Sequence, residues 1–169
     1  LQIFRLEASC QVRSASPWLY FFVLLASSFL LITMNYADDA RDGYILVNAP
    51  VVIGAVTVLG CVLWLLVGTS VAGHAATRDI QTRMHPLTYS APVSKAEYLG
   101  GKFLAAFAIN AIIMLGLPAG MLIAVYLNDL EAEIIGPFRI ATYLSAFFFI
   151  ALPNAFFATA LQFSMAALL

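Results

Sequence analysis

The stretch FLAAFAINAIIMLGLPAGMLIAVYL, residues 103–127, contains no charged residue and no histidine. About 20 consecutive apolar residues are enough for a helix to cross the hydrocarbon layer of a bilayer, so this stretch predicts a membrane-spanning helix. The composition of the chain agrees, because 63% of its residues are hydrophobic and 10% are charged. In a soluble domain about a quarter of the residues are charged. The sequence therefore predicts an all-α, polytopic membrane protein.

Three more apolar stretches, residues 17–36, 51–73 and 138–169, bring the number of predicted spans to four. Pro17 suits the first turn of the first span, and Ser16 is its expected N-cap. In the third span, Gly116 and Gly120 form a GxxxG pattern, which allows two helices to approach closely. Pro118 lies between these glycines and predicts a kink.

The basic residues predict the orientation, because cytoplasmic loops carry an excess of Lys and Arg. Only Arg41 and Arg139 lie in the loops after the first and third spans. The amino-terminal segment and the loop at residues 74–102 are therefore predicted to be cytoplasmic. These two regions hold the other six basic residues: Arg5, Arg13, Arg78, Arg83, Lys95 and Lys102.

The amino-terminal segment, residues 1–16, shows a polar helical stripe. Its polar residues are spaced three or four apart, although Glu7 breaks the pattern. A helix that lies in the membrane interface and a frayed leader are both consistent with this segment. The stripe consists of Gln2, Arg5, Ser9 and Arg13.

Apart from Arg139 at the start of the fourth, the four predicted spans contain no Asp, Glu, Lys or Arg. Ion-coupled transporters and proton pumps usually need an ionisable group at membrane depth, so the sequence argues against both classes. It also contains no P-loop, metal-ligand cluster or paired-carboxylate motif. Any transport would then draw its energy from a partner, most simply a soluble one that acts on the cytoplasmic loop. Pro153 and Asn154 in the fourth span either line a substrate path or form a packed kink.

The cytoplasmic loop has more order than a connector needs. Ile80, Met84 and Leu87 have the spacing of one apolar helical face. Ser94 and Glu97 have the spacing of a capping box, which predicts the start of a new helix that continues into the third span. The loop is therefore interpreted as a short helix, an elbow at residues 90–94 and a capped helix. It is either a docking surface for a partner or a solvated connector.

The motifs of this loop resemble those of ABC-2 type transporter permeases. The similar stretches are RD at residues 78–79, APVSK at 91–95 and YLGGKFL at 98–104. FRLEASCQVRSASPWLYFF near the amino end, NAP at 48–50, GPFR at 136–139 and ALPN at 151–154 resemble a narrower branch of this family. Some members of that branch carry a metallopeptidase-like region far downstream. The chain departs from the family pattern at Pro86, where an acidic residue is common, and at Ala91, where threonine is common.

The resemblance implies that the chain is the amino-terminal part of one permease transmembrane domain, in a bacterial inner membrane. Such permeases form six-helix units that pair as homodimers or with a second half. A cytosolic ABC ATPase subunit binds the ATP and docks on a coupling helix in the loop, here residues 79–89. The implied coupling residues are Arg78, Asp79, Ile80, Arg83, Met84, Leu87 and Tyr89. The elbow between loop and span, which follows from the residues themselves, involves Pro92, Ser94, Lys95 and Glu97.

By this interpretation the chain is not itself an enzyme, binds no cofactor and contacts the lipid bilayer. Separately, the net charge of −1 implies that the chain has no nucleic-acid partner. Two other hypotheses remain open from the sequence. The helices could anchor a metallopeptidase-like enzyme encoded downstream, which a zinc-binding HExxH motif in that sequence would favour. They could also form a membrane scaffold that transports nothing, in which case substitutions in the loop would leave function intact.

Overall fold

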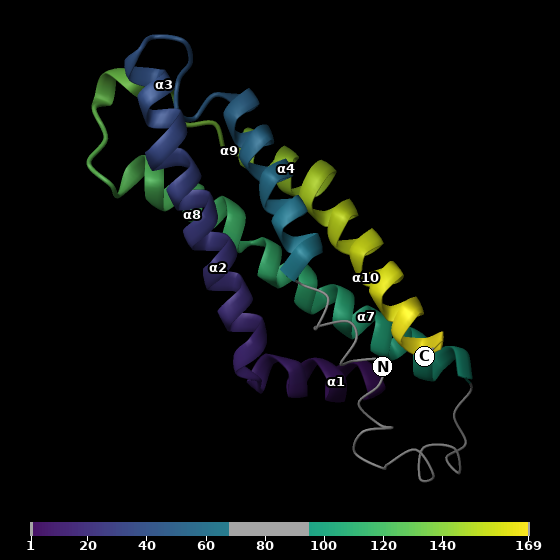
Figure 1. The fold of residues 1–169 in the computed structure, drawn as a ribbon. Helices are drawn as coiled ribbons and strands as arrows, with labels where there is room; N and C mark the ends of the chain where they lie inside the picture. The colour runs from purple at the N-terminus through teal and green to yellow at the C-terminus, as the bar shows by residue number, and fades with distance from the viewer. Residues whose placement is uncertain (1, 68–94, 169) are drawn as a thin grey trace.

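A computed structural model describes residues 2–67 and 95–168, with side chains for 2–66 and 97–165. The described residues form helices and no strand (Figure 1), which confirms the predicted all-α class for this part of the chain. The main elements are α1 (Gln2–Arg13), α2 (Ala15–Leu31), η1 (Ile32–Tyr36), α3 (Ala37–Arg41), α4 (Pro50–Val67), α7 (Lys95–Met114), α8 (Gly116–Tyr126), η2 (Ala132–Ile134), α9 (Ile140–Ala146), η3 (Phe147–Ala151) and α10 (Leu152–Leu168).

Three helical stretches in the described residues are long and apolar enough to cross a membrane. They are Ala15–Arg41, Glu97–Tyr126 and Ile140–Met165, and they coincide with the first, third and fourth predicted spans. The second predicted span is described up to Val67 and contains a shorter apolar helix, Pro50–Leu66. The helices thus fit a multi-pass membrane protein, and a count of four spans stays a prediction.

The first span begins and ends at different residues from those predicted. Ser14, rather than Ser16, is the N-cap of α2, and the Ser14 hydroxyl accepts a hydrogen bond from the Ser16 amide at 3.5 Å. Pro17 still lies in the first turn, where its missing N–H costs no hydrogen bond. The helix also continues past Tyr36 to Arg41, because the π-helical segment η1 joins α2 to α3 without a break.

The third span is interrupted at Leu115, between α7 and α8. Pro118, three residues further on, has no amide hydrogen and cannot donate to the carbonyl of Met114. The kink predicted from Pro118 is therefore present as a break just before Gly116.

Helices α2 and α8 cross at the two glycines of the GxxxG pattern. A Cβ atom on Gly116 would lie 2.5 Å from the Phe21 carbonyl oxygen, and one on Gly120 would overlap the Leu25 carbonyl oxygen and the Ser28 hydroxyl. The Ser28 hydroxyl donates to the Leu117 carbonyl oxygen at 3.0 Å. The close packing predicted from the glycine spacing is confirmed. The core around this crossing includes Leu24, Ile113, Met114, Leu117 and Met121.

Figure 1 shows how the other helices lie around this crossing. Helix α1 turns away from α2 at the lower end of the bundle and packs on α7. Helix α4 packs on α2, where the Tyr20 and Trp64 rings lie 5.6 Å apart between centroids, and α10 packs along α7. Edge-to-face ring pairs join α10 to α7, with Phe103 contacting Phe156 and Phe163 at 5.6 and 5.8 Å between centroids.

Replacing Gly120 with alanine tests the helix crossing. We expect Gly120→Ala to lower the free energy of unfolding by about 1–3 kcal/mol, because the new methyl group overlaps the α2 backbone. Gly54→Ala is the matched control, since Gly54 is also helical and no described atom lies within 4 Å of its added Cβ. It should be neutral or stabilise by up to about 1 kcal/mol. Thermal unfolding in detergent measures both variants, and equal melting temperatures would contradict the crossing.

Candidate functional site at the base of helix α7

The predicted loop residues can be placed only in part. The seven implied coupling residues between Arg78 and Tyr89, together with Pro92 and Ser94, lie outside the described residues. Lys95 is the first residue of α7, and the Glu97 side chain is exposed in its first turn. The cap at Ser94 stays a prediction. The described part of the candidate site is therefore the place where the loop enters the bundle, residues 95–102, which we call the base of α7.

Helix α1 packs directly on the base of α7 through a glycine. A Cβ atom on Gly101 would lie 3.1 Å from Ile3 Cγ2 and 3.5 Å from the Phe4 backbone nitrogen. At the neighbouring Gly100, no described atom lies within 4 Å of the added Cβ. Of the two glycines in the family-like YLGGKFL stretch, Gly101 is thus the one that allows the two helices to meet.

The amino-terminal segment is a helix, and its polar stripe faces outward. Gln2, Arg5, Ser9 and Arg13 all lie on α1 and are exposed. Glu7, which broke the sequence pattern, is 3% exposed. The Gln11 side-chain amide donates to Glu7 Oε1 at 3.3 Å.

A second buried charge lies in the base of α7. Lys102 is 2% exposed, and its Nζ lies 4.9 Å from the centroid of the Tyr98 ring, which provides a cation–π contact. Helices α1 and α7, which pack on each other, thus bury charges of opposite sign. Removing a charge from water costs several kcal/mol unless other groups compensate. The sequence placed Lys102 among the basic residues that set the orientation, and its burial was not predicted. The signal for buried charge in this region was Glu7, a single acidic residue among the apolar residues of the segment 1–16.

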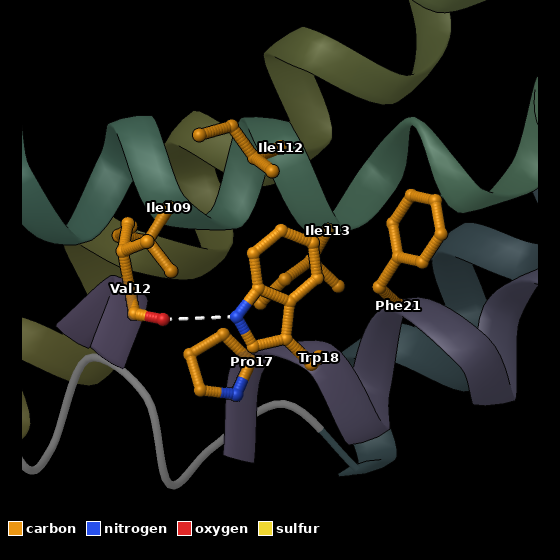
Figure 2. A pocket seen from close by; sticks show the side chains of 7 residues that line it. All are labelled: Val12, Pro17, Trp18, Phe21, Ile109, Ile112 and Ile113. Atoms are coloured by element: carbon orange, nitrogen blue, oxygen red, sulfur yellow. Dashed lines mark hydrogen bonds between the residues drawn. The ribbon is translucent and has the colours of Figure 1, made fainter. Parts of the chain in front are cut away.

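The turn between α1 and α2 is fixed by a tryptophan (Figure 2). The Trp18 indole N–H donates to the Val12 carbonyl oxygen at 2.9 Å. This bond connects the last turn of α1 to the first turn of α2. Beside the indole ring is an apolar pocket lined by Val12, Pro17, Trp18, Phe21, Ile109, Ile112 and Ile113.

At the other end of the bundle, two family-like motifs contact each other. The Asn48 amide donates to the Gly136 carbonyl oxygen and accepts from the Gly136 amide, both at 2.8 Å. It also donates to the Tyr126 hydroxyl at 3.2 Å. NAP and GPFR therefore form a clasp between two loops, which sequence reasoning did not pair. An ion pair between Arg41 and Glu131, at 3.1 Å, lies at the same end of the bundle. Because both side chains are exposed, it contributes little to stability.

The two residues proposed for a substrate path lie at different environments on α10. Pro153 is exposed and follows the π-helical segment η3, whereas Asn154 is half-buried. One turn further along, Thr159 accepts a hydrogen bond from the Asn110 amide of α7 at 2.7 Å, with both side chains fully buried. This polar contact joins α10 to α7.

Within the described ranges, no group of three or more His, Cys, Asp or Glu side chains could hold a metal ion. Comparison of the sequence with models of protein families, with curated proteins and with solved structures found no match.

Enlarging Gly101 tests the contact between α1 and α7. We expect Gly101→Leu to displace α1, because the side chain would occupy the space of Ile3 and the Phe4 backbone. Hydrogen–deuterium exchange of residues 2–13 should then rise at least tenfold. Gly100→Leu adds the same side chain one position away, towards open space, and should leave the exchange unchanged. Equal protection in both variants would show that α1 does not depend on this contact.

Removing the Asn48 side chain tests the clasp. Asn48→Ala leaves the backbone groups of Gly136 without their partner, so we expect a loss on the order of 2 kcal/mol in the free energy of unfolding. Asn128→Ala is the control, because Asn128 is exposed in the neighbouring loop. Thermal unfolding of the two variants should separate them clearly. If Asn48→Ala is as stable as Asn128→Ala, the clasp contributes nothing.

Proposed function

We propose that this chain is the amino-terminal part of a permease subunit of an ABC-2 type transporter. It couples ATP hydrolysis in a cytosolic ATPase subunit to movement of a substrate across the membrane, with export as the expected direction. Two lines support the proposal: the motifs of the loop, and the arrangement at the base of α7. The observation that carries most weight is that α7 is one unbroken helix from Lys95 to Met114, with α1 packed on its base.

In this arrangement a displacement of the loop would move α7 and α1 together. The loop ends where α7 begins, so a displacement of the loop would act on a rigid helix. Helix α1 would follow, because Gly101 holds it against α7 and the Trp18 bond joins it to α2. The break at Leu115 provides a place where α7 can change its angle relative to α8.

Several finer assignments belong to the same proposal. The amino terminus and the loop are cytoplasmic, the membrane is a bacterial inner membrane, and residues 51–73 form a fourth span. Residues 79–89 form the coupling helix, and α1 is the interface helix. A second permease half or another copy of the chain completes the transporter. ATP binds in the partner subunit, and Pro153 and Asn154 are candidate residues of the substrate path, the alternative being a packed kink.

A charge on the proposed docking stripe tests this function. Ile80→Asp and Met84→Asp each place a carboxylate on the apolar face that we expect to contact the ATPase. Since central apolar contacts dominate such interfaces, each variant should reduce co-purification of a P-loop ATPase with the full-length tagged protein by about tenfold or more. Thr82→Asp is the control, because its spacing places the same charge on the opposite face.

The pull-down separates the competing hypotheses. Unchanged recovery of the ATPase with both stripe variants would overturn the coupling-helix assignment. Recovery of no ATPase by the unaltered, folded protein would contradict the permease proposal and favour an enzyme anchor or a scaffold.

A further inference from the structure

The exposed surface of α1 carries positive charge that the helix does not neutralise. Arg5 and Arg13 are both exposed, and the one acidic residue of this helix, Glu7, is buried on the other face. Within the described part of the chain, neither arginine makes an ion pair. This surface is therefore complementary to an anionic partner.

The apolar pocket beside Trp18 begins one residue before this charge in the sequence, because Val12 lines the pocket and the exposed Arg13 follows it in α1. The indole N–H already donates to Val12, so the pocket offers carbon surface and almost no polar group (Figure 2). Trp18 is 46% exposed and Ile112 is 43% exposed. The pocket thus opens on the outer surface of the bundle and not into its interior.

We propose that the turn between α1 and α2 is a binding site for an anionic phospholipid. One acyl chain lies across the exposed surface of Trp18 and Ile112, over the pocket, and the phosphate group contacts Arg13, with Arg5 on the same exposed stripe. The location suits a lipid, because the pocket lies at the end of the apolar helix Ala15–Arg41. Headgroups and acyl chains meet where a spanning helix leaves the hydrocarbon layer.

The charge selects the class of lipid. A zwitterionic phospholipid would fill the same pocket but would gain little from the two arginines. An anionic headgroup gains from each nearby Lys or Arg about a fivefold increase in affinity. A soluble protein could reach the arginines but would not fill a pocket at the level of the acyl chains. The proposal does not depend on the permease function.

The two tryptophans of the chain allow a direct test. Trp64 is 1% exposed, and Trp64→Phe leaves Trp18 as the one tryptophan of these 169 residues. In the full-length protein, the difference between Trp64→Phe and Trp18→Phe/Trp64→Phe isolates the fluorescence of Trp18. The full-length protein is reconstituted in phosphatidylcholine vesicles that contain brominated phosphatidylglycerol or brominated phosphatidylcholine at equal mole fraction. Bromine on an acyl chain quenches the fluorescence of an indole that it touches. We expect the brominated anionic lipid to bind beside Trp18 at least fivefold more strongly, and Arg13→Gln to remove about fivefold.

Matched variants make the result specific. Arg139→Gln removes an exposed arginine from the opposite end of the bundle and should leave the preference intact. Trp18→Phe leaves the buried Trp64 as reporter and should show no headgroup preference. If Trp64→Phe does not fold, the difference between the unaltered protein and Trp18→Phe gives the same signal.

Three results would overturn the site. Equal quenching of Trp18 by both brominated lipids would exclude selection for an anionic headgroup. A preference that persists in the Arg5→Gln/Arg13→Gln double variant would exclude the arginines. No quenching by either lipid would show that no acyl chain contacts Trp18 at the pocket. None of these readouts involves an ATPase or transport, so failure of the lipid site and failure of the permease proposal are distinguishable.

Discussion

The backbone contact between α2 and α8 is the constraint on which the rest of the bundle depends. Between membrane helices the hydrophobic effect supplies no net attraction, so close packing and hydrogen bonds must hold them together. Gly116 and Gly120 bring α8 onto the α2 backbone, and Ser28 adds a hydrogen bond to the Leu117 carbonyl. Because α1 precedes α2 and α7 precedes α8, this crossing also brings α1 to the base of α7.

That second contact holds the amino-terminal helix against the base of α7. Helix α1 is joined to α2 by the Trp18 bond and to α7 by the close approach at Gly101. Glu7 of α1 and Lys102 of α7 are both buried, so the two helices hold charges of opposite sign away from water. We therefore interpret α1 and the base of α7 as one unit, which would respond to the loop as a whole and would present Arg5 and Arg13 to the lipid headgroups.

Local patterns in the sequence predicted the helices well, whereas contacts between distant residues were not predictable. Uncharged runs located three helices that can span a membrane, and the spacing of Gly116 and Gly120 predicted a close crossing but not its partner helix. The first cap was misplaced by two residues, since Ser14 and Ser16 are equally good capping residues. The pairing of Asn48 with Gly136 depends on how two loops meet in three dimensions, which no local spacing records.

We propose that an ATPase docks on the loop before α7 and that movement of the ATPase displaces α7 together with α1. The most direct measurement is an electron cryomicroscopy structure of the full-length protein, purified in mild detergent with its bound partners. The account predicts an ATPase subunit seated on residues 78–89, with Ile3 packed beside Gly101 at the base of α7. An ATPase bound to another surface, or a folded assembly without one, would contradict it.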